Sequence, residues 1–152
     1  MNIQLNDTVA LVTGATRGIG AAIAVELARS GATVVGTATS ESGAERISQT
    51  LSKAGVAGRG VVLDVRDAEQ ISALIADITA NEGAPGILVN NAGITRDNLA
   101  MRMADEDWDA VIDTNLSAVF RVSRAVLRGM MKARAGRIIN IGSVGGIMRN
   151  AG

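Results

Sequence analysis

Three glycines near the N-terminus, Gly14, Gly18 and Gly20, could together hold a phosphate group. They follow an apolar run that ends at Thr13 and precede a run of helix formers, so the sequence predicts a strand, a tight turn and a helix start. The first turn of a helix offers free backbone N–H groups and the positive end of the helix dipole, which attract a phosphate or pyrophosphate. Glycine fits because a Cβ atom would block the approach of the phosphates. The spacing differs from the most familiar glycine fingerprint, so an ordinary strand-to-helix turn is the alternative interpretation.

Polar residues also follow three other predicted strands. Asp64 and Val65 come after one strand, residues 90–93 (Asn-Asn-Ala-Gly) after the next, and Ser143 after the last. Each group alone could be turn chemistry, since Gly, Asn, Asp and Ser are common in loops. The carboxyl ends of parallel strands meet at one edge of a sheet, where ligands bind in such folds. Together with the glycine turn, these residues predict one binding site at that edge.

The residues after the second predicted strand indicate which nucleotide would bind. Sites for NAD usually place an acidic residue there, whereas sites for NADP lack it and have a cation near the 2′-phosphate. Residues 36–40 contain no carboxylate, and the first acidic residue is Glu41. Arg17 in the glycine turn could bind the phosphate, and the hydroxyl of Thr37 could donate a hydrogen bond. We therefore predict NADP(H) as cofactor; a solvated arginine at a helix start is the alternative for Arg17.

Asn115 stands out in the long helix predicted for residues 105–134. It lies three residues after Ile112 and four before Val119, which predicts that it shares their apolar face. A buried amide must be hydrogen-bonded. It could bond a nearby carbonyl in the core, or it could hold a water or a kinked turn beside the site. The sequence leaves both interpretations open.

Short apolar segments alternate with amphipathic segments along the chain. The predicted strands are 8–13, 33–38, 60–64, 87–90 and 137–142, and the predicted helices are 18–30, 42–55, 67–81 and 105–134. Ser42 with Glu45, Asp67 with Gln70, and Asp105 are the expected N-terminal caps, and Gly31 ends the first helix. Parallel strands need such crossovers. We predict an α/β, Rossmann-type doubly wound parallel sheet, with five strands in the order 3-2-1-4-5 and residues 1–152 as a single domain.

Composition excludes several functional classes. The 152 residues carry 15 basic and 15 acidic side chains, so no net charge draws the chain to nucleic acid or to an anionic membrane. Cysteine and histidine are absent, which excludes disulfides, thiolate chemistry, histidine metal sites and Ser-His triads. The N-terminus does not resemble a signal peptide, and no apolar run approaches the ~18 residues of a membrane span. We predict a cytoplasmic protein.

These motifs together resemble the short-chain dehydrogenase/reductase family. The resemblance depends on residues 13–20, Asp64 with Val65, residues 90–93, Asn115 and residues 141–143. Within the family, residues 36–40, 93–99 and 136–143 resemble the bacterial enzymes that use NADPH to reduce 3-oxoacyl groups carried on acyl carrier protein. That activity, in fatty acid synthesis, is what the resemblance implies. A reductase of another ketone, such as acetoacetyl-CoA, and a non-catalytic dinucleotide-binding module are the alternatives.

The resemblance also implies roles for individual residues. The glycine turn would hold the pyrophosphate, Arg17 and Thr37 the 2′-phosphate, and Asp64 with Val65 the adenine. Ser143 would hydrogen-bond the substrate carbonyl, and Asn115 would anchor a water in a proton relay. The implied cofactor-binding residues are Gly14, Thr16, Arg17, Gly18, Ile19, Gly20, Thr37, Asp64, Val65, Asn90, Ala92 and Gly93. No metal site is expected.

The family's chemistry further uses a tyrosine as general acid and a lysine one helical turn later, both after the serine. This sequence has no tyrosine, and its lysines are Lys53 and Lys132. We therefore expect the sequence to be the front part of a longer reductase. By itself it should be nearly inert, because general acid catalysis contributes about 10²- to 10⁴-fold.

The 105–134 helix carries apolar residues around much of its circumference, which predicts a second covering surface. In the family this cover is the same helix of another subunit, and the enzymes are usually tetrameric, so we expect self-association through this helix. Basic residues near its end could dock acidic acyl carrier protein, with Arg134 as the expected contact. A solvated basic face is the alternative.

Overall fold

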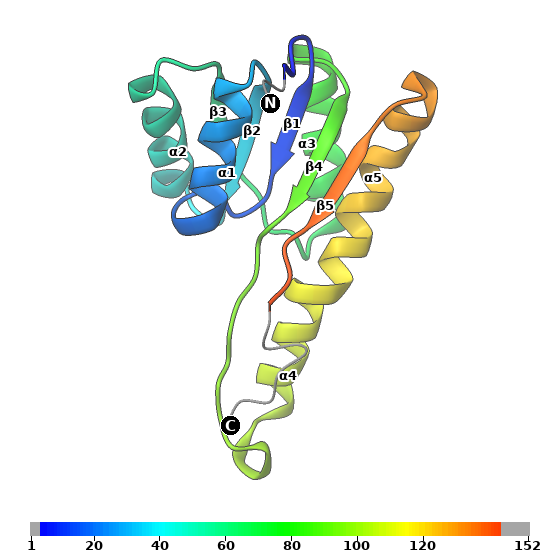
Figure 1. Ribbon diagram of the computed structural model, residues 1–152. Helices are drawn as coiled ribbons and strands as arrows, with labels where there is room; N and C mark the ends of the chain where they lie inside the picture. Colours follow the sequence, from blue (N-terminus) through cyan, green and yellow to red (C-terminus); the bar gives the residue numbers. More distant parts are fainter. Residues whose placement is uncertain (1–3, 144–152) are drawn as a thin grey trace.

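The computed structural model describes residues 4–143 and is built around one parallel sheet (Figure 1). The strand order is β3-β2-β1-β4-β5, and every pairing between them is parallel. The strands are β1 (Val9–Val12), β2 (Thr33–Ala38), β3 (Gly58–Val62), β4 (Pro85–Asn90) and β5 (Arg137–Asn140). The predicted fold class and strand order are therefore confirmed.

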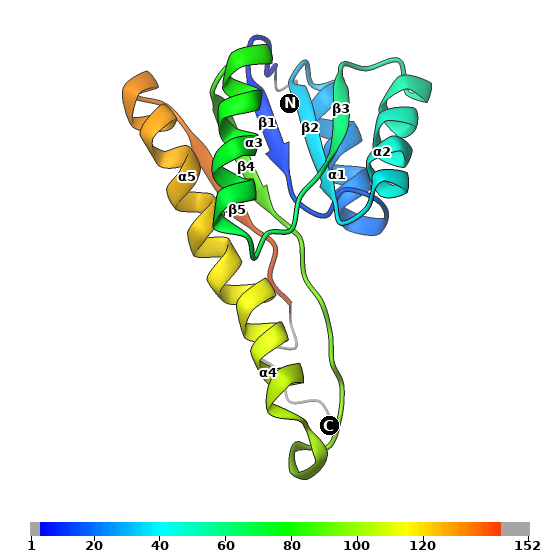
Figure 2. The ribbon, with the colours of Figure 1, turned by 180° about the vertical axis from the view of Figure 1, so that it is seen from behind.

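Helices cover both faces of this sheet. The α-helices are α1 (Gly18–Arg29), α2 (Glu41–Lys53), α3 (Ala68–Asn81), α4 (Asp105–Ile112) and α5 (Ala118–Ala133). A short 3₁₀ helix, η1 (Ala100–Arg102), precedes α4, and a π-helical turn, η2 (Asp113–Ser117), joins α4 to α5. Figures 1 and 2 show α1 and α2 on one face and α3 and α5 on the other. These layers bury the central strands β1, β2 and β4, as expected for parallel strands, whereas the edge strands β3 and β5 are partly exposed.

The central strand β1 contributes side chains to two hydrophobic cores, one on each face of the sheet. Val9 and Leu11 belong to the cluster under α3 and α5, whereas Ala10 and Val12 belong to the cluster under α1 and α2. All four are buried, because successive side chains of a strand point to opposite faces and both faces are covered here. This is why β1 is a continuous apolar run in the sequence. Its carboxyl end, and the glycine turn that follows, are thereby held at the middle of the sheet.

Two of the predicted helix caps are right and two are wrong. Asp67 caps α3 by accepting from the N–H groups of Glu69 and Gln70, and Gly31 follows α1 with a φ of +100°. Helix α2, however, begins before Ser42 and is capped by Ser40, whose Oγ accepts from the Gly43 N–H at 3.2 Å. Asp105 is the first residue of α4 instead of its cap. There its carboxylate joins two other acids in the first turn, where the helix dipole favours negative charge.

Strand boundaries follow the pairing partners more than the local sequence. The predicted strand 60–64 begins and ends two residues earlier as β3, because the last residue of β2, Ala38, pairs with Val62. Asp64 therefore lies in the loop beyond the strand. Strand β4 begins at Pro85, earlier than predicted, and β5 ends at Asn140, two residues before the predicted end.

The predicted continuous helix over 105–134 is interrupted by the π-helical turn η2. A π turn inserts extra backbone into a helix, so side chains after it are rotated relative to those before it. Asn115 lies within this turn and is exposed, so the prediction that it is buried with Ile112 and Val119 is wrong. Arg121 Nη1 donates to Asp113 Oδ1 at 2.6 Å, which ties the first residue of the π turn to α5.

Over residues 4–143, none of the helices combines the length and the apolar character needed to cross a bilayer.

Candidate nucleotide-binding site

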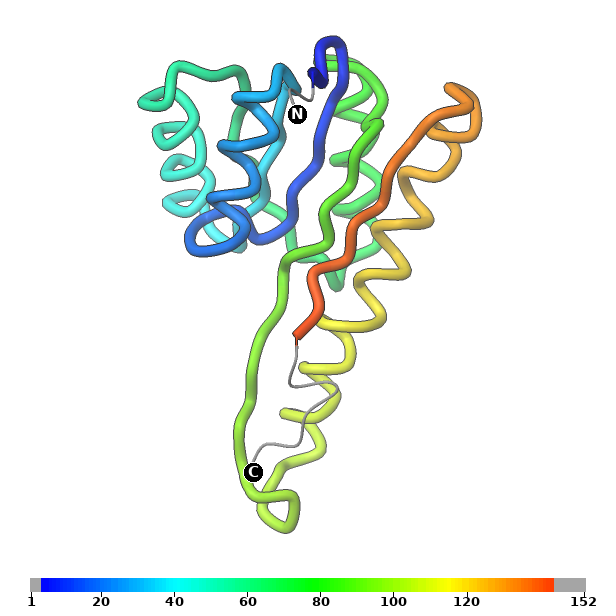
Figure 3. Tube along the Cα trace, viewed as in Figure 1, coloured from blue at the N-terminus to red at the C-terminus, as the bar shows by residue number. Residues whose placement is uncertain are grey.

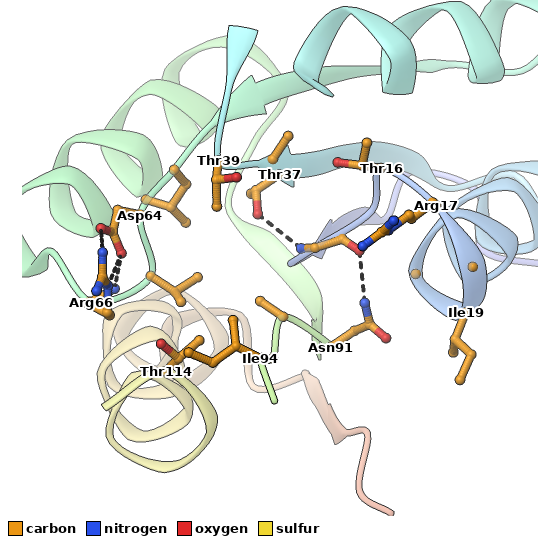
Figure 4. Close-up of a pocket in the computed structure, with 18 of the residues that line it drawn as sticks. Thr16, Arg17, Ile19, Thr37, Thr39, Asp64, Arg66, Asn91, Ile94 and Thr114 are labelled. Atoms are coloured by element: carbon orange, nitrogen blue, oxygen red, sulfur yellow. Dashed lines mark hydrogen bonds and ion pairs between the residues drawn. The ribbon is translucent and has the colours of Figure 1, made fainter. Parts of the chain in front are cut away.

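A cavity of about 750 Å³ opens at the carboxyl edge of the sheet, where the sequence predicts the site (Figure 4). The ends of β1, β2, β3 and β4, the start of α1 and the π turn all contribute to its wall. The cavity brings together eleven of the twelve predicted cofactor-binding residues: Gly14, Thr16, Arg17, Gly18, Ile19, Gly20, Thr37, Asp64, Val65, Ala92 and Gly93.

Two glycines of the turn are required by close backbone contacts. Gly14 has a φ of +66°, and a Cβ atom there would lie 2.9 Å from the Cα of Ala92. A Cβ on Gly20 would overlap the carbonyl oxygen of Gly14 and the side-chain nitrogen of Asn91. Such contacts cannot be relieved by rotating a flexible side chain alone, since the Gly14 oxygen belongs to the backbone. The glycine pattern therefore packs the turn against β4 as well as leaving room for a ligand.

The start of α1 differs from the starts of its neighbours. Helices α2 and α3 are capped by the side chains of Ser40 and Asp67, whereas the residue at the cap of α1, Arg17, makes no side-chain cap bond. The first turn of α1 contains no acidic residue. Gly18, Ile19 and Gly20 line the cavity at this point. The first N–H groups of α1 thus lack a side-chain acceptor, which fits a phosphate in that position.

Thr13 and Asn91 join the glycine turn to the end of β4 through hydrogen bonds that the two motifs did not predict. Thr13 is 2% exposed, and its Oγ1 accepts from the N–H groups of Asn91 and Ala92, both at 3.0 Å. The Asn91 side-chain amide in turn donates to the carbonyls of Thr13 and Gly14 at 3.1 and 2.9 Å. The threonine before the glycine turn and the doubled asparagine after β4 were the available signals.

Thr37 lines the cavity but also supports the glycine turn. It is 1% exposed, and its Oγ1 accepts from the Gly14 N–H at 3.3 Å (Figure 4). A hydroxyl that accepts one bond can still donate another, so the expected contact with a 2′-phosphate stays a prediction. Thr39, which is exposed and lines the same cavity, adds a second hydroxyl at the end of β2.

Asp64 is held by Arg66, a cavity residue that the sequence analysis missed. Arg66 Nε donates to Asp64 Oδ1 at 2.9 Å, and Nη2 donates to Oδ2 at 2.7 Å. The hydrogen bond from Arg66 holds the pKa of the Asp64 carboxyl below its ordinary value, although partial burial opposes this. The carboxylate is therefore ionised and fixed in direction. The sequence shows an aspartate and an arginine two residues apart, but it does not show the rotamers that bring their side chains together.

Asn90 is the predicted cofactor residue that does not line this cavity. Its side chain is buried, and its Nδ2 donates to Ser123 Oγ at 3.1 Å and to Asn140 Oδ1 at 2.9 Å. These bonds link β4 to α5 and β5. They show a structural role for Asn90, and its contact with a cofactor stays a prediction.

Asn115 fixes the loop that follows β4. Its Oδ1 accepts from the Ile94 N–H and its Nδ2 donates to the Ile94 carbonyl, both at 2.8 Å. Figure 3 shows this segment leaving the sheet and extending toward α4. The Asn115 amide therefore bonds a nearby backbone carbonyl, but in an exposed loop and not in the core as the first interpretation had it. Its role in holding a water stays a prediction.

Ser143, the other predicted catalytic residue, is exposed and follows β5 at the same edge of the sheet. It does not belong to the lining of the cavity. Within residues 4–143, His, Cys, Asp and Glu form no cluster that could hold a metal ion.

Comparison with known proteins decides the family of this fold and site. Residues 8–152 match the family model described as short chain dehydrogenase. The chain belongs to the short-chain dehydrogenase family. Membership implies a nicotinamide dinucleotide cofactor.

Several curated relatives of this short-chain dehydrogenase share the name 3-oxoacyl-[acyl-carrier-protein] reductase FabG. The protein from Pseudomonas aeruginosa is 61% identical over 150 residues, which cover 99% of this chain and 61% of the relative. Those from Escherichia coli strain K12 and Vibrio harveyi are 60% and 59% identical over 150 residues, again covering 99% of this chain and 60% of each relative. The chain thus spans about three-fifths of the length of the curated relatives it matches.

Proposed function

We propose that this sequence carries the NADPH-binding part of a reductase that converts 3-oxoacyl-[acyl-carrier-protein] to 3-hydroxyacyl-[acyl-carrier-protein]. Residues 1–152 would form one dinucleotide-binding domain of a cytoplasmic enzyme. The observation that carries the proposal is the start of α1: it faces the cavity without a capping side chain or an acidic residue, and Arg17 stands beside it. The proposed substrate is the one that appears in the names of the relatives.

The charge around the cavity supports NADP(H) over NAD(H). The cavity lining includes the cations Arg17, Arg66 and Arg96, and one carboxylate, Asp64, which is paired with Arg66. Glu41, the first acid after β2, begins α2 and does not line the cavity. Over the described residues, Arg17 has no ion pair with a carboxylate, so its charge is available to a 2′-phosphate.

The catalytic part of the proposal gives each residue a limited role. NADPH supplies the hydride when it is bound. Ser143 would donate a hydrogen bond to the substrate carbonyl, where negative charge develops, and Asn115 would support the proton relay from the π turn. The sequence contains no tyrosine that could act as the family's general acid, so residues 1–152 alone should bind the cofactor and reduce ketones poorly.

Partner binding is proposed for the exposed face of η2 and α5. Leu116, Phe120, Leu127 and Met131 fall on this face at helical spacing and are 43–74% exposed. We expect them to pack against another copy of the chain, as apolar patches of this kind require cover. Light scattering at micromolar concentration should show an oligomer, and Phe120→Asp should convert it to monomer. A wild-type chain that is a monomer throughout would contradict this.

The substrate assignment is tested by titrating the NADPH-saturated protein with 3-oxoacyl-[acyl-carrier-protein] and with acetoacetyl-CoA. Arg134, exposed at the end of α5, would contact the acidic carrier. We expect the carrier-linked substrate to bind tighter, and Arg134→Glu to weaken its binding about tenfold through like-charge repulsion, with acetoacetyl-CoA unaffected. Equal binding of both substrates by the wild type would favour a reductase of another ketone.

A further inference from the structure

Arg66 is fixed on the wall of the cavity by three hydrogen bonds to one carboxylate. Besides the two guanidinium bonds described above, the backbone N–H of Arg66 donates to Asp64 Oδ1 at 2.9 Å. Two parallel bonds from a guanidinium fix both the position and the plane of a carboxylate, which a lysine ammonium could not do. Arg66 therefore determines how Asp64 is presented to a ligand.

These bonds leave Asp64 with one open acceptor position. An ionised carboxylate offers about four lone-pair positions, two on each oxygen. Oδ1 accepts two hydrogen bonds from Arg66 and Oδ2 accepts one, so the open position is on Oδ2. The Asp64 side chain is 39% exposed, and the residue lines the cavity, so a ligand can reach it. Its pKa is held below the ordinary value, so it acts as an acceptor only.

The surroundings of this acceptor suit a flat heterocycle. The apolar residues Leu63 and Val65 flank Asp64 in the sequence and line the cavity, and Ile94 lines it as well. Figure 4 places that pair on the opposite side of the cavity from Arg17 and Ile19, at the start of α1. A dinucleotide with its phosphates at α1 would thus extend one of its two bases toward Asp64. An acceptor fixed there favours a base that offers an N–H group.

The resemblance to the family already gives Asp64 to adenine. We propose that Arg66 determines how strongly the cavity prefers an amino-bearing purine, by holding Asp64 so that Oδ2 can accept from the exocyclic amino group. This inference rests on the proposed function, because it requires a nicotinamide dinucleotide in the cavity. Arg66 acts through Asp64 and is therefore a positioning residue.

The test compares the binding of NADPH with that of its hypoxanthine analogue, in which an oxygen replaces the amino group. The wild-type chain is expected to bind NADPH at least about tenfold tighter, since the analogue would leave a charged acceptor unpaired. In Arg66→Gln the preference should fall to about twofold or less, and Arg66→Lys should restore only part of it. Asp64→Asn, which presents an amide donor, should reverse the preference.

Arg59 provides a matched control at the other end of β3. Its guanidinium donates to Asp77 Oδ2 at 2.5 Å and to Glu82 Oε1 at 2.7 Å, and none of these three residues lines the cavity. Arg59→Gln therefore also removes charged hydrogen bonds, but away from the cavity wall. It should leave the base preference at the wild-type value. A natively folded Arg66→Gln variant that keeps the wild-type preference would overturn the inference while the proposed function stands. A wild-type chain that binds neither nucleotide would instead overturn the proposed function.

Discussion

Gly20→Ala is expected to abolish binding of nicotinamide dinucleotides to this chain. The added Cβ would overlap the Gly14 carbonyl oxygen and the Asn91 amide, and both belong to the junction between the glycine turn and β4. The turn must therefore move away from β4, which displaces the first N–H groups of α1 from the phosphate. Overpacking of this kind costs about 1–3 kcal/mol of stability, and affinity should fall more than about 100-fold. Calorimetric titration with NADPH measures the effect.

Gly55→Ala is the matched control for that experiment. Gly55 has a φ of +68°, so alanine there also strains the backbone, but no atom lies within 4 Å of the added Cβ. It follows α2 and does not line the cavity. The free energy of unfolding of Gly55→Ala should be about 1 kcal/mol lower than that of the wild type, and its affinity for NADPH should be unchanged. If Gly20→Ala bound NADPH as tightly as Gly55→Ala, the turn would not be the phosphate site.

Thr13→Val is expected to give the second large effect, on stability. Valine fits the space of threonine, but it removes the oxygen that accepts from the backbone N–H groups of Asn91 and Ala92. Each unsatisfied buried donor costs about 1–3 kcal/mol, and these two N–H groups are partly buried, so the free energy of unfolding should fall by about 2–4 kcal/mol. Urea unfolding measures this, and an unchanged m-value would show that the unfolded state is the same.

The control for Thr13→Val is Thr50→Val on the exposed surface of α2. Thr50 Oγ1 donates to the Arg46 carbonyl at 2.8 Å, and water can replace the lost donor. We expect a change within about 0.5 kcal/mol. Equal losses in the two variants would contradict the assigned role of Thr13, because the cost would then come from strand or helix propensity and not from the β1–β4 junction.

The arrangement of the sheet could be predicted because it depends on periodic, short-range patterns. Each of these patterns can be recognised within a few positions of the sequence. They are the four buried residues of β1, the apolar residues at helical spacing in α3, and the turn at Gly31. The rule that ligands bind at the carboxyl ends of parallel strands then places the site. The rule predicts that Gly14, Asp64 and Gly93 lie together, and all three line one cavity.

What could not be predicted depends on contacts between distant segments or on exact side-chain directions. Thr13 reaches Asn91 across 78 positions, and nothing local to either residue shows that they meet. The π turn rotates Asn115 away from the face that a regular helix would give it. The resemblance gave Asn90 a cofactor role, and it did not show that the Asn90 side chain also bonds Ser123 across the β4–α5 junction. In each case, packing between distant segments or an irregular turn determined what the side chain contacts.

The central claim is that the uncapped start of α1 binds the phosphates of NADP(H), with Arg17 on the 2′-phosphate. The most direct test is NMR mapping of the chain with saturating NADP⁺ and then NAD⁺. The account predicts that both nucleotides shift the amide signals of Gly18, Ile19 and Gly20, and that only NADP⁺ shifts the guanidinium signal of Arg17. Amide shifts confined to residues outside the cavity, or an Arg17 signal that responds equally to both nucleotides, would contradict it.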